Sequence, residues 1–151
     1  MYSVFIAGVV LGSGMVVACY KNMKEEKMKV KKYYYKVVRN VDGCYLASIF
    51  KHRYSLVYVP GKWTEPEIGK IYIFEKIEDA RTFGFSFPTE IWKVEAKGVQ
   101  LAMFCLVPDF LNREEYVEEF WNSKKLLLGK STSVPLGSFV AKKVKLIERV
   151  E

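Results

Sequence analysis

Residues 1–20 carry no charged side chain, and this run constrains the fold more than any other feature of the chain. As an α-helix with a rise of about 1.5 Å per residue, it would extend roughly 30 Å, the thickness of the hydrocarbon core of a bilayer. We therefore expect a transmembrane helix over residues 1–20. Gly8 and Gly12 have the G-x-x-x-G spacing that lets two membrane helices approach closely, so self-association through them is a further hypothesis.

The segment that follows the uncharged run is rich in lysine. Seven lysines and two glutamates between Lys21 and Lys36 give it a local charge of +5, out of a formal net charge of +7 for the whole chain. The positive-inside tendency then predicts a single-pass membrane protein with its N-terminus outside and its domain in the cytoplasm. Lys21, Lys24 and Lys27 are the expected contacts with anionic headgroups at the membrane surface.

Three other interpretations of the N-terminal run stay open. A cleaved secretory signal has basic residues ahead of its apolar core, and residues 1–3 supply none. The small residues before Cys19 have the character of a bacterial lipoprotein processing site, at which Cys19 would carry the lipid. An N-terminal helix buried in a globular protein would also tolerate the glycines of this run.

The remaining charge bears on possible partners. Residues 37–151 carry only +2 of the net charge, so the basic character lies mostly in the segment after the uncharged run. Nucleic-acid binding would need basic residues spread over the folded domain, and we do not expect it. The aromatic residues 33–35 stand beside lysines and could stack on bases, but an aromatic-rich strand is more often part of a core.

The cysteines and the single histidine do not form a metal-binding pattern. Cys19, Cys44 and Cys105 show no C-x-x-C spacing, and His52 is the only histidine, whereas a structural zinc site needs four ligands. We expect no metal and no cofactor. A disulfide between Cys44 and Cys105 stays open if the domain lies in an oxidising compartment.

The rest of the chain predicts one α+β domain over residues 32–151, joined to the helix by a basic stem over residues 21–31. Asp42-Gly43 is a tight-turn dipeptide between two alternating segments and predicts a hairpin. We expect a curved, largely antiparallel sheet. Its expected strands cover residues 32–40, 44–50, 54–59, 70–75, 91–96, 99–106 and 139–150.

Two helices are expected beside this sheet. Residues 77–83 fit a short helix with Glu78 and Asp79 at its positive end. A longer helix begins at Asn112, which forms a capping-box pattern with Glu115, and a glycine at position 129 would follow its end. Dipole compensation accounts for the glutamates in its first turns without a catalytic role.

Several segments of the domain resemble small uncharacterised proteins of phages, other prokaryotic viruses or their hosts. These segments are YYYKVVR, YVPGKW, EPEIGKIYIFEKIEDARTF, EIWKVEAK and GSFVAKKVKLIERV, and together they cover most of the chain after the stem. The resemblance implies a viral origin and these fold boundaries. It brings no established activity.

The order of elements is also similar to that of ADP-ribosyltransferase-like domains. In that family an arginine or histidine on the first strand holds NAD, a central serine or tyrosine supports it, and a late glutamate orients the ribose. The resemblance implies Arg39, Ser86 and Glu95 as the corresponding residues here, with NAD as cofactor. The S-T-S motif of that family is missing from this sequence. This enzyme is therefore the alternative interpretation.

The preferred interpretation is a membrane-anchored interaction or structural module with an unidentified protein partner. Catalytic constellations are missing, whereas aromatic residues are frequent outside the expected strands. Trp63, Phe85 and Phe87 are the candidate partner-binding residues, and Trp63, flanked by a proline and glycines, is also expected to cap one end of the core.

Overall fold

The computed structural model describes residues 31–48, 54–83, 88–106, 108–111, 113–123 and 129–151. Within these ranges no helix combines the length and the apolar character needed to cross a bilayer. The prediction of a single-pass membrane protein, with its transmembrane helix and cytoplasmic domain, is corrected by this finding. The run over residues 1–20 and the stem lysines Lys21, Lys24 and Lys27 lie outside the described residues, as do Gly8 and Gly12.

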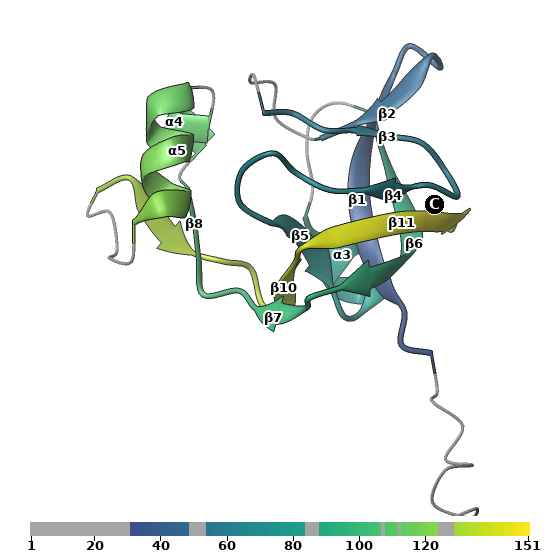
Figure 1. Cartoon of the computed structure of the whole chain (residues 1–151). Coiled ribbons are helices and arrows are strands. Elements are labelled where there is room, and N and C mark those ends of the chain that lie inside the picture. Colours follow the sequence, from purple (N-terminus) through teal and green to yellow (C-terminus); the bar gives the residue numbers. More distant parts are fainter. Residues whose placement is uncertain (1–30, 49–53, 84–87, 107, 112, 124–128) are drawn as a thin grey trace, which may run out of the picture. The chain divides into compact units, whose positions relative to one another are not determined.

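The part of the chain from Lys32 onward forms one compact unit built on a curved antiparallel sheet (Figure 1). The strand order in this sheet is β4-β11-β6-β1-β5-β10-β7, and β2 joins β1 and β3 beside this path. Every pairing is antiparallel, as the sequence predicts. The strands are β1 (Tyr34–Val41), β2 (Tyr45–Ala47), β3 (Val57–Tyr58), β4 (Trp63–Thr64), β5 (Ile71–Phe74), β6 (Thr89–Lys97), β7 (Gln100–Leu101), β10 (Ser138–Ala141) and β11 (Lys143–Arg149).

Strand β1 organises the sheet because it has different partners at its two ends. Along one edge it pairs with β6 from Tyr34 to Arg39. On the other edge it pairs with β5 only at Tyr35 and with β2 only from Arg39 onward. Residues 36–38 therefore have no described strand partner on that edge, and β5 and β2 diverge there. This divergence opens the sheet at the middle of β1.

The predicted hairpin is confirmed. Asp42 and Gly43 form its turn with positive φ values of 52° and 71°, and Val41 pairs with Tyr45 across it. Glycine adopts such values freely, and aspartate is one of the few other residues that tolerates them. The Asn40 side chain accepts a hydrogen bond from the Gly43 N–H at 2.8 Å, which further fixes the turn.

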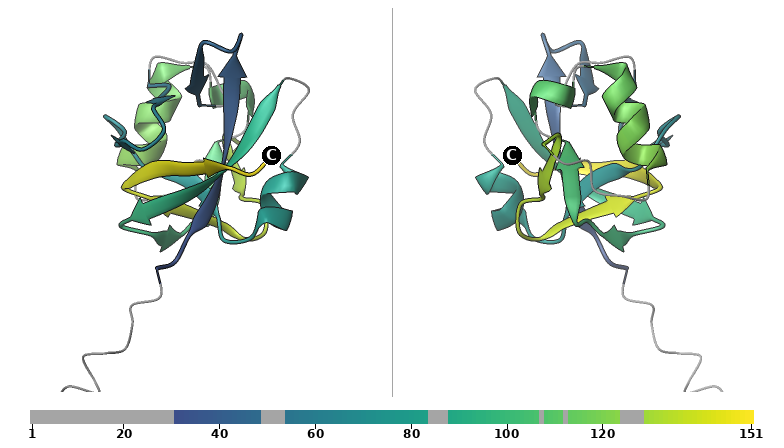
Figure 2. Two further views of the ribbon diagram at one scale, coloured as in Figure 1. Left: turned by 90° about the vertical axis from the view of Figure 1, so that its right-hand side faces the viewer. Right: turned by 90° about the vertical axis from the view of Figure 1, so that its left-hand side faces the viewer.

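A long excursion of the chain leaves the sheet and returns to the neighbouring strand. Strands β7 and β10 are paired, yet residues 102–137 lie between them in the sequence. We call residues 102–137 the cover segment. It contains a separate antiparallel pair, β8 (Phe104–Leu106) with β9 (Ser131–Ser133), and the helices α4 (Pro108–Leu111) and α5 (Glu114–Asn122). Figures 1 and 2 show it standing beside the sheet.

The helix predicted over residues 77–83 is observed as α3 (Ile77–Thr82), with Ala80 buried against the sheet. The longer predicted helix is observed as α5. Asn112, its predicted N-cap, lies outside the described residues, and the Arg113 side chain makes no capping hydrogen bond. In α5, Val117 is buried and faces the sheet side of the cover segment.

The main core fills the concave interior of the sheet. Its buried members come from β1, β2, β3, β5, β6, β10 and β11, and they are Tyr34, Val38, Leu46, Tyr58, Ile71, Ile73, Val94, Ala141, Val144 and Leu146. A second, smaller cluster packs α3 on the opposite face and contains Val37, Phe74, Ala80 and Ile91. The alternation predicted for residues 91–96 and 143–146 is confirmed, since Val94, Val144 and Leu146 point inward.

Two predicted strands are wrong in their extent. Residues 99–106 were expected to form one strand buried on both faces, but the chain leaves the main sheet at Ala102 and continues as β8 in the cover segment. Leu101 and Met103 are accordingly 68% and 66% exposed. Residues 139–150 divide at Lys142, whose backbone N–H donates to the carbonyl of Lys97, and the two halves pair with different strands.

Candidate functional site

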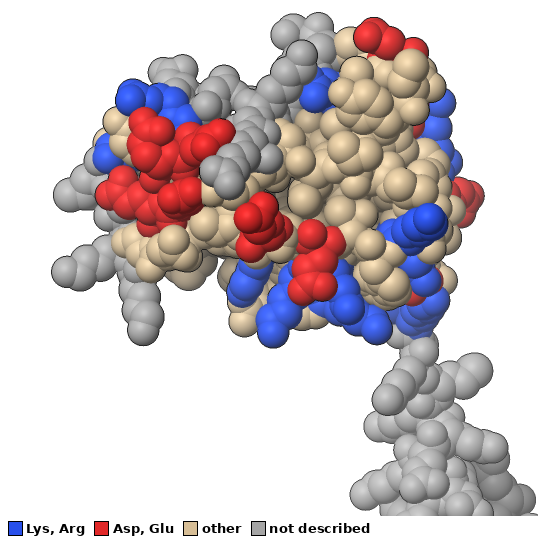
Figure 3. All heavy atoms as spheres, turned by 45° about the horizontal axis from the view of Figure 1, so that its top comes forward, with Lys and Arg blue, Asp and Glu red and all other residues tan. Residues whose placement is uncertain are grey.

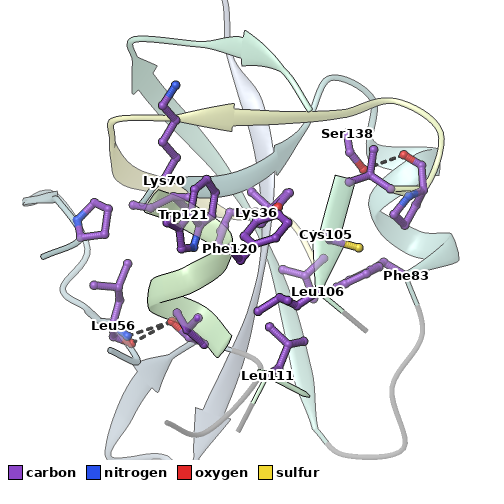
Figure 4. A pocket seen from close by; sticks show the side chains of 18 of the residues that line it. Lys36, Leu56, Lys70, Phe83, Cys105, Leu106, Leu111, Phe120, Trp121 and Ser138 are labelled. Carbon is purple, nitrogen blue, oxygen red and sulfur yellow. Dashed lines mark hydrogen bonds between the residues drawn. The ribbon is translucent and has the colours of Figure 1, made fainter. Parts of the chain in front are cut away.

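A cavity of about 610 Å³ lies between the opened sheet and the cover segment (Figure 4). Its volume falls within the range of about 300–1,000 Å³ that is usual for small-molecule sites. Most of the lining side chains are apolar or aromatic. They include Val37, Leu56, Pro66, Ile68, Ile71, Phe74, Phe83, Leu106, Leu111, Val117, Phe120 and Trp121.

The cover segment is held against the sheet by aromatic and polar contacts around this cavity. The Trp121 ring packs on the Tyr72 ring with centroids 5.8 Å apart. The Tyr72 hydroxyl donates to the carbonyl oxygen of Phe104 at 2.7 Å, and the Tyr54 hydroxyl donates to the Glu118 carboxylate. These contacts join β5 to β8 and the chain before β3 to α5, so the cavity has walls from both layers.

Gly69 permits a close approach of the two layers. A Cβ atom at this position would lie 2.3 Å from the Trp121 ring, and the backbone of Gly69 has a φ of 74°. Only glycine satisfies both conditions, because the left-handed conformation is strained for other residues and the indole occupies the space of any side chain. The position of the indole in the cavity wall therefore depends on Gly69.

Lys36 is the charged residue in the interior of this site. It follows from the alternation of β1 that Lys36 shares the concave face with Tyr34 and Val38, and only 9% of its surface is exposed. Its ammonium lies 5.9 Å from the centroid of the Tyr58 ring. Burial lowers the pKa of Lys36 to about 8, because the apolar surroundings disfavour the charged form.

In the described part of the chain, no carboxylate compensates the Lys36 amine. Among the described residues, none of the side chains that line the cavity is an aspartate or glutamate, and no described carboxylate forms an ion pair with Lys36. Lys70 is the other lysine at the cavity. Its ammonium donates a hydrogen bond to the side-chain oxygen of Gln100 on the exposed side. Lys36 thus places an uncompensated positive charge at neutral pH inside an apolar cavity.

Apart from Lys36 and Lys70, the polar groups of the described wall are neutral. Burial raises the pKa of Tyr58, against the opposing effect of a hydrogen bond with Ser48, so Tyr58 stays protonated. Burial likewise raises the pKa of the Cys105 thiol. Cys105 and Cys44 are both free, and Cys44 lies exposed in the hairpin turn. The described part of the site therefore offers one buried ammonium, a second ammonium at its exposed side, several hydroxyl groups and a large apolar surface.

A second polar cluster ties three strands of the sheet together. The buried carboxylate of Glu90 on β6 accepts hydrogen bonds from Asn40 Nδ2 at 2.7 Å and Trp92 Nε1 at 2.8 Å. The Arg149 guanidinium of β11 lies 3.4 Å from it. Burial opposes ionisation, but these hydrogen bonds and the guanidinium hold the pKa of Glu90 below its usual value. The carboxylate of Glu90 is thus hydrogen-bonded and ion-paired within the fold.

The residues implied by the ADP-ribosyltransferase resemblance are not brought together. Arg39 pairs with Thr89 at one end of β1, whereas Glu95 lies six residues further along β6, a separation of roughly 20 Å along the strand. Glu95 forms an ion pair with Lys145 at 3.2 Å. Arg39 Nε is buried without a described hydrogen-bond partner. Ser86 lies outside the described residues, and neither Arg39 nor Glu95 lines the Lys36 cavity.

Of the three predicted partner-binding residues, the structure describes only Trp63. Phe85 and Phe87 lie outside the described residues. Trp63 does not cap the core, because it sits on the edge strand β4 and is 37% exposed. In the described ranges, no three histidine, cysteine or acidic side chains gather closely enough to hold a metal ion.

Sequence reasoning missed Lys36 because the residue was counted in the charge of the lysine-rich segment Lys21–Lys36. The signal that would have found it is the alternation of β1, which places Lys36 on the same face as Tyr34 and Val38. The sequence held no such signal for the wall that the cover segment forms. That wall exists only because the cover segment returns to the sheet.

Comparison of the chain with protein-family models, with curated proteins and with solved structures finds no match. These comparisons bring no support for a phage or viral origin, and that expectation is withdrawn.

Proposed function

We propose that the protein binds a small amphipathic anion in the Lys36 cavity. The observation that carries this proposal is the ammonium of Lys36, which is nine-tenths buried, has no described carboxylate partner and borders a cavity of about 610 Å³. An uncompensated buried charge costs free energy, and a bound anion would offset that cost.

The chemistry of the lining supports a ligand with two distinct parts. The rings of Phe120 and Trp121 and the side chain of Leu56 suit an aliphatic or aromatic body, which would leave water on binding. Lys36 suits a carboxylate or another compact anionic group at one end of that body. Hydroxyl groups from Ser48 and Tyr58 can orient the head group as additional hydrogen-bond donors.

Binding should depend on the protonation of Lys36. An anion next to the amine favours its charged form and raises its pKa above the value of about 8 in the free protein. Binding near pH 8 is therefore accompanied by proton uptake. As the pH rises from 8 to 10 the affinity for an anionic ligand falls, whereas the affinity for a neutral ligand of the same shape does not change.

The test compares decanoate with decanol, which differ in the charged head, by displacement of the fluorescent anion 8-anilinonaphthalene-1-sulfonate from the full chain. We expect decanoate to bind more tightly at pH 7. Lys36→Met should weaken decanoate binding by about 10- to 100-fold, the value of a charge-assisted hydrogen bond, and leave decanol binding unchanged. The matched control is Lys62→Met, which removes an exposed lysine from the β3–β4 turn.

Two outcomes contradict the proposal. Equal affinities for decanoate and decanol would show that Lys36 does not contribute to binding of the charged head group. Unchanged decanoate binding in the Lys36→Met variant would show that the anion binds elsewhere. Thermal unfolding of both variants checks that each is folded under the conditions of the binding measurement.

A further inference from the structure

A second site lies on the convex face of the sheet, away from the Lys36 cavity. The indole of Trp63 on the edge strand β4 is 37% exposed and is bordered by three lysine ammonium groups. The ammonium groups of Lys97, Lys145 and Lys143 lie 4.9, 5.0 and 5.7 Å from its ring centroid. We call Trp63 and these three lysines the Trp63 surface.

The strand register explains how these side chains come together. Trp63 is paired with Lys145 across β4 and β11, and Lys143 is paired with Lys97 across β11 and β6. The intervening residue Val144 points into the core, so Lys143 and Lys145 both point outward. Neighbouring strands lie about 4.8 Å apart, and this spacing sets the side chains side by side on one face.

The charges on this surface are not balanced within the fold. Like charges that face each other directly across two strands are destabilising, and Lys97 faces Lys143 in this way. Lys145 has Glu95 as an ion-pair partner at 3.2 Å. No described carboxylate lies within ion-pair distance of Lys97 or Lys143. An external anion would relieve this repulsion.

A second aromatic residue continues the same face. On β6, Lys93 points to the same side as Lys97, and its ammonium lies 4.6 Å from the centroid of the Tyr33 ring, just before β1 begins. Three strand spacings separate β4 from β1, or about 14 Å. Lys93 also lies 4.0 Å from the Glu148 carboxylate. Aromatic rings therefore stand at both ends of a band across the sheet in which lysines outnumber carboxylates.

We propose that the Trp63 surface binds single-stranded nucleic acid, with a base stacked on Trp63 and the backbone phosphates next to Lys97, Lys143 and Lys145. Exposed aromatic rings interleaved with lysines are the combination that such surfaces use, because every base has a π-face and every nucleotide carries a negative charge. A duplex keeps its bases inside the stack and could not use Trp63. An acidic peptide would satisfy the lysines but leave the exposed part of the indole without a stacking partner.

Charge is unevenly distributed over the face of the molecule that Figure 3 shows. Acidic side chains gather over α5, whereas lysine and arginine side chains gather along the lower edge of the sheet in the view of Figure 3. Two more exposed lysines, Lys62 and Lys142, stand next to members of the Trp63 surface in the sequence. A polyanion approaching the molecule is thus attracted to the sheet and repelled from α5.

The experiment measures the fluorescence anisotropy of a fluorescein-labelled twelve-nucleotide oligo(dT) with the full chain at several salt concentrations. We expect Trp63→Ala to weaken binding by roughly 5- to 100-fold, the effect of one lost stacking contact, and Trp63→Phe to retain most of the affinity. Lys97→Gln combined with Lys143→Gln should weaken binding and reduce the slope of log affinity against log salt by about 1.4, or about 0.7 for each phosphate contact.

Matched controls are Tyr45→Ala, an exposed aromatic residue on β2, and Lys76→Gln, an exposed lysine before α3. Both should bind the oligonucleotide as the unchanged chain does. The proposal is overturned if Trp63→Ala binds as tightly as the unchanged chain, or if a duplex of the same length binds equally well. It is also overturned if poly-glutamate binds and the oligonucleotide does not, a result that would indicate an acidic peptide partner. Circular dichroism of every variant confirms that the sheet is intact.

Discussion

Replacing Lys36 with methionine should make the protein more stable at neutral pH. Methionine has a similar length and no charge, so it keeps the apolar contacts of the lysine stem and removes the buried ammonium. In the unfolded chain Lys36 is solvated and has a pKa near 10.5, whereas burial lowers its pKa to about 8 in the folded protein. The charged form is therefore less favourable in the folded state.

The magnitude follows from this difference in pKa. One pKa unit corresponds to about 1.4 kcal/mol, so a shift from 10.5 to about 8 costs the folded state about 3 kcal/mol when Lys36 is protonated in both states. Between pH 8 and 10.5 the unfolded chain binds more protons at this residue than the folded one, and the stability of the unchanged protein rises with pH. The advantage of Lys36→Met should therefore fall from about 3 kcal/mol at pH 7 to about 1 kcal/mol at pH 10.

Urea unfolding of both proteins at pH 6, 7, 8, 9 and 10, followed by circular dichroism, measures this difference directly. Other groups titrate in the same range, but they are common to both proteins and cancel in the comparison. Thermal unfolding at pH 7 should show an increase in Tm of about 6–12 °C for the variant. A variant that is less stable at pH 7, or a stability difference that does not change with pH, would refute the reasoning about a buried uncompensated charge.

Three further results are expected. Gly69→Ala should destabilise the fold by about 1–3 kcal/mol and shift the tryptophan emission, because the new methyl group displaces Trp121; unchanged emission would contradict the packing described. Glu90→Gln should destabilise the protein at pH 7, and since the pKa of Glu90 is lowered on folding, the difference should shrink as the pH falls below about 4, as acid titration followed by urea unfolding can measure. Iodoacetamide should label Cys44 faster than Cys105, because burial raises the pKa of the Cys105 thiol and shields it. Peptide mass spectrometry measures both labelling rates, and equal rates would indicate that the cavity wall is open.

Local patterns predicted much of the sheet. The Asp42-Gly43 turn predicted the β1–β2 hairpin, and the alternation around Val94 predicted which residues of β6 face the core. Both features depend on interactions between near neighbours in the sequence. The short helix α3 was predicted for the same reason, from acidic residues in its first turn and an inward-facing alanine.

The larger arrangement could not be predicted because it depends on contacts between distant segments. An apolar run such as residues 99–106 indicates burial, but it does not say that Leu101 pairs with Phe139 while Cys105 pairs with Thr132 in another sheet. The cavity has the same origin. Lys36 and Trp121 line the same cavity only because the cover segment between β7 and β10 folds back over the opened part of β1.

The insertion of residues 102–137 between two paired strands separates the main sheet from the segment that covers it. Ala102 donates its backbone N–H to the carbonyl of Ser138, so the excursion starts and ends at the same place on the sheet. The scaffold is complete without the excursion, and a short β-hairpin loop could replace it without disturbing any pairing of the scaffold strands. For the proposed ligand, the sequence and length of the cover segment would set the shape of the apolar part of the site, while Lys36 would keep its position on β1.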